Sequence, residues 1–380
     1  MLELPPLSLY IHIPWCVQKC PYCDFNSHAL KQGLPEQEYI GHLLNDLEAD
    51  LPLTSGREIS TIFIGGGTPS LFSAEGMQQL LDGVRARIAV AADAEITMEA
   101  NPGTVEADRF TGYQQAGINR ISIGVQSFAA DKLQRLGRIH GPQEAVRAAE
   151  LATGLGLRSF NLDLMHGLPE QSLEEALADL RQAIALAPPH LSWYQLTIEP
   201  NTLFNSRPPV LPDEDMLWLI FSEGHKLLTE AGYEQYEISA YARPGYQCQH
   251  NLNYWRFGDY LGIGCGAHGK LSFTDGRILR TVKTRHPKGY LQGRYTDNHS
   301  EVALDDRPFE FFMNRFRLLE PAPRADFPRF TGLSEESIRP AIEQALRAGY
   351  IEETTTHWQL TEHGKLFLNS LLELFITLDA

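Results

Sequence analysis

The stretch "STIFIGGGTPSLFSAEGMQQLLDGVRARI", residues 60–88, contains one complete strand–loop–helix unit. Its first seven residues form the short apolar run, rich in β-branched side chains, that is typical of a buried strand. From Ser73 to Ile88 the apolar residues recur at helical spacing, and Ser73, closely followed by Glu75, occupies the expected N-cap position. The glycine-rich loop "GGGTP" joins the two elements. We therefore predict a buried strand connected to an amphipathic helix.

The same pattern recurs from residue 7 to about residue 200. Helical segments such as "SLEEALADLRQAIAL", with Ser172 at its N-cap, separate a series of short apolar runs. Besides "STIFIGG", these runs are "SLYIHI" at 8–13, "EITMEA" at 95–100, "RISIGVQ" at 120–126, "SFNLDLM" at 159–165 and "LSWYQLT" at 191–197. Six strand–helix units in series predict an α/β fold with parallel strands, right-handed crossovers and helices covering the sheet. Periodicity leaves open whether the sheet curves into a barrel.

Every predicted strand ends in a polar or glycine-rich loop. The loops are "CVQKC", "GGGTP", "EANPGT", "GVQSF", "DLMHGLP" and "TIEPNT". The carboxyl ends of parallel strands meet at one face of the sheet, and chemistry collects at that face in such folds. We therefore expect one large active site built from these loops.

Composition limits the partners and the compartment. Lys+Arg 32 against Asp+Glu 48 gives a formal net charge of −16, and no long acidic tail accounts for it. An acidic surface repels phosphate backbones and anionic lipid, so nucleic acid is not expected as a partner. The start "MLELPPLSLYIHIPW" does not read as a signal peptide, and no apolar stretch approaches the ~20 residues of a transmembrane segment. A cytoplasmic protein is expected.

Three of the five cysteines, Cys16, Cys20 and Cys23, are clustered in "CVQKCPYC" after the first predicted strand. Thiolates spaced C-x3-C-x2-C can hold one face of an iron–sulfur cubane or contribute to a zinc site. Zinc requires a fourth protein ligand, and no second C-x2-C or His pair lies nearby, although His12 and His28 flank the cluster. A [4Fe–4S] cluster held by three cysteines leaves one iron open to an exogenous ligand.

The remaining chain divides into two further regions. Residues 206–304 begin with a helical pattern at 213–233 and continue with aromatic and glycine-rich loops, including "HNLNYW" at 250–255. Residues 305–380 contain helical segments, then "GYIEETTTHWQLTEHG", which reads as a hairpin, and a final helix, "LFLNSLLELF", at 366–375. This order predicts a small α+β, winged-helix-like domain. We interpret it as a packing appendage rather than a DNA reader, given the acidic balance.

The motif "CVQKCPYC" at the end of a first strand resembles that of the radical S-adenosylmethionine (SAM) superfamily. In that family SAM chelates the open iron, and an electron from the cluster cleaves its sulfonium to a 5′-deoxyadenosyl radical. The resemblance implies a partial (β/α)6 barrel over residues 1–205, completed by residues 206–304. It also implies a [4Fe–4S] cluster on Cys16, Cys20 and Cys23, bound SAM, and an electron donor for the cluster.

The resemblance also implies which residues of this chain bind SAM. Gly66, Gly67 and Thr68 in "GGGTP" would meet the methionyl amino group, Glu99 would accept bonds from the amine or ribose, and Arg138 would hold the carboxylate. Other polar positions that match are Tyr10, Tyr22, Gln126 and Asp163. Singly, each position has a structural explanation as a turn glycine, a helix-terminal arginine or a capping aspartate. Together, at consecutive strand ends, they favour a cofactor site.

Almost the whole chain resembles the oxygen-independent coproporphyrinogen III dehydrogenase branch. The motifs that carry this are "LYIHIPWCVQKCPYCDF", "IFIGGGTPS", "EANPGT", "RISIGVQSF", "LGRIH" and "DLMHGLP". In the dehydrogenase a fourth cysteine follows, but Phe25 stands here, and the enzyme's N-terminal extension precedes its motif whereas Cys16 comes almost at once. Both departures argue against porphyrinogen decarboxylation. It remains the alternative function because the cofactor motifs are complete.

The motif "HNLNYW" matches the H-N-x-x-Y-W motif of heme chaperones related to the dehydrogenase. That resemblance implies heme as cargo, transfer to acceptor hemoproteins such as respiratory-chain proteins, and peripheral contact with a membrane. A neutral imidazole is a good axial ligand for heme iron, and aromatic rings pack on a porphyrin face. We predict His250 as the ligand, Tyr254 and Trp255 as walls, and Asn251 as an orienting group.

Two questions stay open at this point. His250 is either this ligand or a surface histidine beside packed aromatic residues. Cys248, Cys265 and His268 are further conceivable iron ligands, but equally well buried small residues and a loop histidine.

Overall fold

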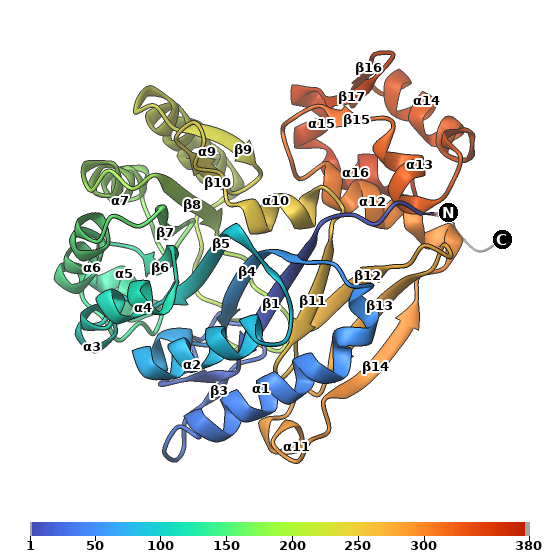
Figure 1. The fold of residues 1–380 in the computed structure, drawn as a ribbon. Coiled ribbons are helices and arrows are strands. Elements are labelled where there is room, and N and C mark those ends of the chain that lie inside the picture. Colours follow the sequence, from blue (N-terminus) through green and yellow to red (C-terminus); the bar gives the residue numbers. More distant parts are fainter. Residues whose placement is uncertain (1, 377–380) are drawn as a thin grey trace.

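The computed structural model describes residues 2–376, so the last four residues of the predicted domain 305–380 lie outside the described part. A twelve-stranded sheet dominates the molecule (Figure 1), in the order β14-β13-β12-β11-β1-β4-β5-β6-β7-β8-β10-β9. The six predicted strands are confirmed and pair in parallel. They are β1 (Leu7–Ile13), β4 (Ile59–Gly66), β5 (Val90–Ala100), β6 (Arg120–Gln126), β7 (Ser159–His166) and β8 (His190–Gln195).

A seventh parallel strand, β11 (Asp259–Ile263), pairs with the free edge of β1. The prediction of six strands missed it because "DYLGI" is short and lies in a glycine-rich region. Antiparallel strands β12 (His268–Ser272), β13 (Ile278–Lys283) and β14 (Thr296–Glu301) extend the sheet beyond it, and β10 (Ala240–Ala242) and β9 (Glu234–Glu237) follow β8 at the other edge. The edge strands β14 and β9 do not pair, so the barrel is partial.

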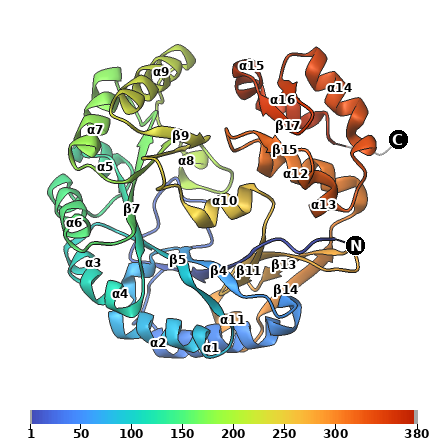
Figure 2. The ribbon, with the colours of Figure 1, turned by 45° about the horizontal axis from the view of Figure 1, so that its top comes forward.

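Helices cover the convex face of the sheet, as Figures 1 and 2 show. They are α1 (Glu36–Asp50), α2 (Ala74–Arg85), α3 (Thr104–Asp108), α4 (Phe110–Ala116), α5 (Ala130–Arg135), α6 (Pro142–Gly154), α7 (Leu173–Ala185) and α9 (Glu214–Glu230). Both predicted N-caps are confirmed. The Ser73 hydroxyl accepts a bond from the Gly76 N–H, and the Ser172 hydroxyl accepts one from the Glu175 N–H within a capping box.

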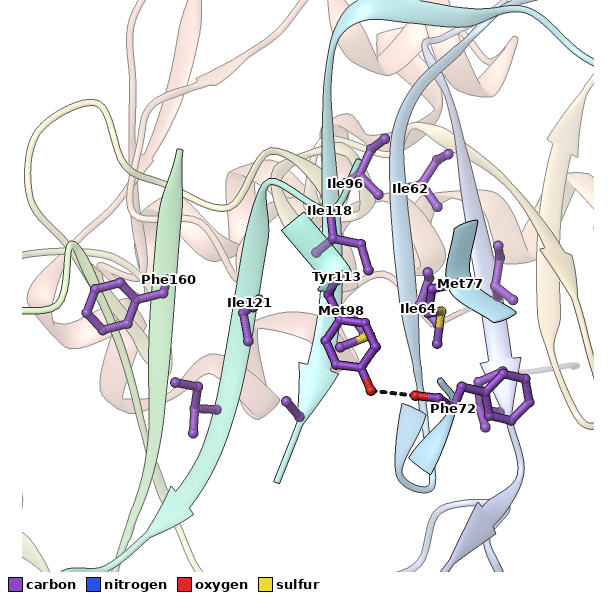
Figure 3. Packing of buried hydrophobic residues seen from close by; sticks show 14 of the residues in the cluster. Ile62, Ile64, Phe72, Met77, Ile96, Met98, Tyr113, Ile118, Ile121 and Phe160 are labelled. Carbon is purple, nitrogen blue, oxygen red and sulfur yellow. Dashed lines mark hydrogen bonds between the residues drawn. The ribbon is translucent and has the colours of Figure 1, made fainter. Parts of the chain in front are cut away.

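The main hydrophobic core fills the layer between the sheet and these helices. Ile62 and Ile64 of β4 are buried and pack there with Met77 of α2 (Figure 3), while Phe63 between them lies on the opposite face, since side chains alternate along a strand. The Tyr113 hydroxyl of α4 donates to the Phe72 carbonyl oxygen at 2.5 Å. This packing fixes which strand residues face the interior of the barrel.

Helix α10 (Gln249–Trp255), which contains the motif "HNLNYW", packs near the amino-terminal ends of β1 and β4. The Glu95 carboxylate accepts bonds from the N–H groups of Gln249 and His250, at 3.1 and 3.2 Å. These are two of the four N–H groups that a helix start leaves without partners. Figure 2 shows α10 across the opening of the barrel. The motif therefore lies at the end of the strands opposite to the cysteine loop.

The C-terminal segment has its own buried cluster around Phe312, Phe327 and Trp358, which Phe257 and Ile278 of the preceding region join. The segment contains α12 (Arg307–Arg315), β15 (Ala322–Pro323), α13 (Asp326–Thr331), α14 (Arg339–Arg347), the hairpin of β16 (Ile351–Glu353) and β17 (His357–Leu360), α15 (Glu362–Leu366) and α16 (Leu368–Glu373). The predicted hairpin after a helix is confirmed. The predicted final helix at 366–375 is confirmed as α16, and a separate short helix, α15, precedes it.

The remaining elements are short connections. They are β2 (Trp15–Cys16), β3 (His28–Ala29), α8 (Leu203–Ser206), α11 (Pro287–Tyr290) and the 3-10 helices Leu51–Thr54, Pro69–Leu71, Leu304–Asp306 and Glu335–Ile338. The pair β2–β3 holds the two ends of the cysteine loop together.

Candidate cofactor site and adjoining cavity

The cysteine loop leaves the carboxyl end of β1 and folds over the end of the barrel. The N–H of Cys23 donates to the Cys20 carbonyl oxygen at 3.1 Å, which tightens the loop. Cys16, Cys20 and Cys23 are free thiols and line one cavity. The Arg138 guanidinium donates to the Cys20 sulfur at 3.7 Å. The three predicted cluster ligands therefore face a common space.

The arrangement of donors suits a cluster better than a single ion. Among residues 2–376, no three cysteine, histidine or acidic side chains approach one another closely enough to hold one metal ion. In a cubane each thiolate binds its own iron, so convergence on one point is not required. Of the flanking histidines, His12 lies 2.8 Å from both the Tyr10 hydroxyl and the Asn26 carbonyl oxygen, and His28 contacts the Asn26 amide oxygen. Both ring nitrogens of His12 and the Nε2 atom of His28 are therefore engaged by groups other than the thiols.

The glycine loop after β4 lies directly against the cysteine loop. A Cβ at Gly67 would lie 2.5 Å from the Trp15 carbonyl oxygen, so only glycine fits there. The N–H groups of Gly66, Gly67 and Thr68 donate to the Glu99 carboxylate, the Ile13 carbonyl and the Trp15 carbonyl, at 3.0, 2.7 and 2.7 Å. Because these donors are used, carbonyl oxygens are the groups left to accept a bond from an amine.

Two carboxyl groups, Glu99 of β5 and Asp163 of β7, face the same cavity. Burial, and then the charge of Asp163, raise the pKa of Glu99 to about 8. Asp163 accepts bonds from the Asn161 amide at 2.8 Å and the Ser122 hydroxyl at 3.2 Å, and burial raises its pKa as well. Two buried carboxyl groups close together are stabilised by a cation, so the site suits a positively charged ligand.

Gln126 and Arg138 are held rigidly at the rim. Gln126 has a φ of 68°, a left-handed conformation that is unusual for a side-chain-bearing residue, and its amide oxygen accepts from the Tyr194 hydroxyl at 2.8 Å. Arg138 donates to the Asn101 amide oxygen and the Gly124 carbonyl, both at 2.8 Å. Asn101 and Tyr194 were not predicted as site residues, although Asn101 lies in the quoted loop "EANPGT" and Tyr194 in the quoted strand "LSWYQLT".

The structure brings almost all the predicted SAM positions together with the cysteines. One cavity is lined by Tyr22, Gly66, Gly67, Thr68, Glu99, Gln126, Arg138 and Asp163 as well as by the three thiols. Tyr10 is the exception, because it lines an adjoining cavity.

That adjoining cavity has a volume of about 780 Å³ and runs over the inner face of β1, β11, β12 and β13 toward α10. Phe25, Gly66 and Glu99 line both cavities, so the two spaces meet there. The aromatic, imidazole and cationic residues of the larger cavity are Tyr10, His12, Phe25, Tyr254, Trp255, Phe257, Tyr260, His268, Lys270, Arg280 and Arg285. Of these, Phe257, Tyr260, Lys270, Arg280 and Arg285 were not predicted from the sequence, since β11–β13 were not predicted as strands.

The residues predicted from the motif "HNLNYW" lie in two different environments. Tyr254 and Trp255 line the larger cavity, whereas His250 and Asn251 do not. His250 is fully buried, with Nδ1 2.8 Å from the Thr61 hydroxyl and Nε2 2.7 Å from the Tyr254 hydroxyl. Burial lowers its pKa to about 3. The alternative of a surface histidine is therefore wrong, and iron binding by His250 would require one of these bonds to break.

Comparisons with known proteins agree with this architecture. Residues 10–183 match the radical SAM superfamily model, and residues 302–367 match the HemN C-terminal domain model. The solved structure of coproporphyrinogen III oxidase (HemN) from Escherichia coli superimposes with a TM-score of 0.84 at 23% identity, covering 98% of this chain and 91% of that chain. The fold is therefore that of a radical SAM protein, and residues 10–183 carry the match to that superfamily.

Two curated relatives define the branch. The heme chaperone HemW of Escherichia coli (strain K12) is 75% identical over 376 residues, which cover 99% of this chain and 100% of the relative. The heme chaperone HemW of Haemophilus influenzae is 65% identical over 381 residues, with the same coverage. The chain belongs to the HemW family.

Proposed function

We propose that this protein is a heme chaperone, which binds heme and passes it to acceptor hemoproteins. The observation that carries the proposal is the 780 Å³ cavity, lined by aromatic and cationic side chains, that meets the cysteine cavity at Phe25, Gly66 and Glu99. Its volume lies within the range of about 300–1,000 Å³ that is usual for ligand sites. The relatives that are 75% and 65% identical are named heme chaperones.

In this proposal Cys16, Cys20 and Cys23 hold a [4Fe–4S] cluster with exchangeable SAM beside it. When bound, the pair supplies one-electron chemistry, for which a separate electron donor is needed. Arg138, fixed by Asn101, is placed to hold a carboxylate next to Cys20. Glu99 and Asp163 would stabilise the cationic groups of SAM, and the remaining predicted positions are Tyr10, Tyr22, Gly66, Gly67, Thr68 and Gln126.

The alternative, oxidative decarboxylation of coproporphyrinogen, is not favoured. Phe25 occupies the position of the dehydrogenase's fourth cysteine and lines both cavities. The oxidase of solved structure shares 23% identity, far below the heme chaperones, and that level of likeness supports the fold alone.

The net charge of the chain is the one feature from which we propose the kind of acceptor protein. A formal net charge of −16 favours acceptor proteins with basic docking faces, including respiratory-chain proteins at a membrane surface.

Among residues 2–376 there is no helix with the length and apolar character that a membrane span needs.

The test is heme loading followed by delivery. The protein, with its cluster reconstituted without oxygen, would be titrated with hemin and then mixed with an apo-b-type cytochrome while the Soret band is followed. We expect stoichiometric binding and transfer to the cytochrome faster than from hemin bound to albumin. Absence of binding overturns the proposal, and formation of vinyl groups from coproporphyrinogen would establish the enzyme instead.

A further inference from the structure

The inner face of the sheet presents a set of side chains in register toward the larger cavity. Tyr10 of β1 pairs with Gly262 of β11, and His268 of β12 pairs with Val282 of β13. One step along the same face, Tyr260 pairs with Lys270, which pairs with Arg280. All of these except Gly262 line the cavity, and a Cβ at Gly262 would lie 2.1 Å from the His268 carbonyl oxygen. Glycine at this position therefore lets the backbone of β12 at His268 approach β11 closely.

The imidazoles differ in whether a nitrogen is free to bind a metal. His12 lines the cavity, but both of its nitrogens contact Tyr10 and Asn26. His250 lies outside the cavity lining, and both of its nitrogens contact Thr61 and Tyr254. His268 is exposed, lines the cavity, and neither of its ring nitrogens forms a hydrogen bond with another residue in the range 2–376.

The two remaining cysteines are poor candidates. The Cys248 thiol is buried beside Glu95 at 3.6 Å, and the Cys265 thiol donates to the Arg285 carbonyl at 3.1 Å. Burial raises the pKa of each to about 12, and a thiol must lose its proton to bind iron well. Neither cysteine is part of the cavity lining.

We propose that His268, rather than His250, is the residue that binds heme iron, an inference that rests on the proposed function. Burial, together with the charges of Arg280 and Arg285, lowers the pKa of His268, which supports a neutral imidazole at physiological pH. A neutral imidazole is the form that binds metals.

The rest of the cavity fits a porphyrin seated on His268. The rings of Tyr254 and Tyr260 meet edge to face, with centroids 4.6 Å apart, and offer an apolar wall. Lys270 and Arg280 are paired with Asp259 and Glu310. The Arg285 guanidinium has no ion pair within the described part of the chain and is exposed at the cavity, so it is the cation available to a propionate.

His250 has a different part in this arrangement. Its bond to the Tyr254 hydroxyl holds that ring in the cavity wall, which makes it a positioning residue. Its loss should therefore alter how tightly heme fits, while the ligand of the iron stays the same.

The test compares His268→Ala, His268→Met, His250→Gln and a control, His299→Ala, each in the full chain with its cluster reconstituted. His299 is exposed on β14, cross-strand from Thr281, and is not part of the cavity lining. Hemin titration gives affinity, and electron paramagnetic resonance and the Soret band report the iron's ligand. SAM binding by each variant checks that it is folded.

We expect wild type, His250→Gln and His299→Ala to share one ligand signature. His268→Ala should lose it, with affinity lower by about tenfold or more, and added imidazole should restore it. His268→Met should give the signature of thioether ligation. An unchanged signature in both His268 variants, or its loss in His250→Gln, would overturn the proposal while leaving heme binding intact. Failure of the wild type to bind hemin would instead overturn the proposed function.

Discussion

The Nε2 atom of His250 lies 2.7 Å from the hydroxyl oxygen of Tyr254, one helical turn further along α10. The other ring nitrogen lies 2.8 Å from the Thr61 hydroxyl of β4. Because both nitrogens are satisfied and the side chain is fully buried, the imidazole is neutral in the folded protein. Through these two contacts His250 connects Tyr254, in the wall of the larger cavity, to Thr61 of β4 in the amino-terminal half of the barrel.

This relationship predicts a pH dependence of stability. Burial lowers the pKa of His250 to about 3, whereas the unfolded chain has the ordinary value of about 6.5. Between these values the unfolded state binds one more proton, so the free energy of unfolding falls as pH falls, by about 1.4 kcal/mol per pH unit from this residue. His250→Gln keeps a hydrogen-bonding side chain but cannot titrate. We expect urea unfolding of the variant to show a correspondingly shallower loss of stability between pH 6.5 and 4.

The matched control is His299→Gln, which changes an exposed histidine on β14. Its pH profile should follow that of the wild type. Parallel profiles for wild type and His250→Gln would mean that the buried imidazole is protonated in the folded state.

The cysteine loop predicts which thiols are needed for iron binding. Serine at position 16, 20 or 23 removes one of three ligands, so each variant should lose most of the roughly four irons and four sulfides of a cubane. Cys248→Ser is the control, because that thiol lies at the other end of the strands beside Glu95. Iron and sulfide analysis after anaerobic reconstitution measures the effect. Equal iron in all four variants would remove the cluster assignment.

The raised pKa of Glu99 predicts that SAM binding releases a proton. Its pKa of about 8 means that most of this carboxyl is protonated at pH 7, and a cation beside it favours the ionised form. Binding should then release a proton, and affinity should fall by up to about tenfold per pH unit below pH 8. Calorimetry in two buffers of different ionisation enthalpy counts the protons. In Glu99→Gln, only protons from the titration of SAM itself should be released on binding. If wild type and Glu99→Gln release the same number of protons, Glu99 is not the linked group.

Lys283 predicts a large loss of stability on substitution. Its ammonium group lies 2.5 Å from Asp46 and 2.6 Å from Asp50, all three being buried, and the Tyr290 hydroxyl donates to Asp46 at 2.7 Å. Lys283→Met leaves two carboxylates without their cation, which should cost about 3–5 kcal/mol in urea unfolding at pH 7. The exposed Lys288→Met serves as control. A loss below about 1 kcal/mol would indicate that water reaches the carboxylates.

The parallel part of the fold could be predicted because each strand carries its own local signal. The run "STIFIGG" is apolar enough to be a buried strand, and Ser73 and Ser172 cap the helices through bonds that span only three residues. Strand β11 could not be predicted in this way. It is five residues long, and what defines it is pairing with β1, about 250 residues earlier in the sequence.

The candidate site, too, could be predicted only in part from the sequence. The strand-end loops that approach the cysteines could be found from the sequence, since parallel strands bring their carboxyl ends together. The environment of His250 could not, because Thr61 is 189 residues away and only the packed structure shows that both nitrogens are engaged. His268 was one of several conceivable ligands in the sequence, and only the folded structure shows that it lines the larger cavity.

The meeting point of the two cavities has a consequence for how this family can diverge. A mutation at Gly66 or Glu99 alters the lining of both spaces at once, so selection for one ligand is constrained by the other. His268 and Arg285 line only the larger cavity. Substitutions at these two positions can therefore change the larger cavity while the lining of the cysteine cavity stays the same.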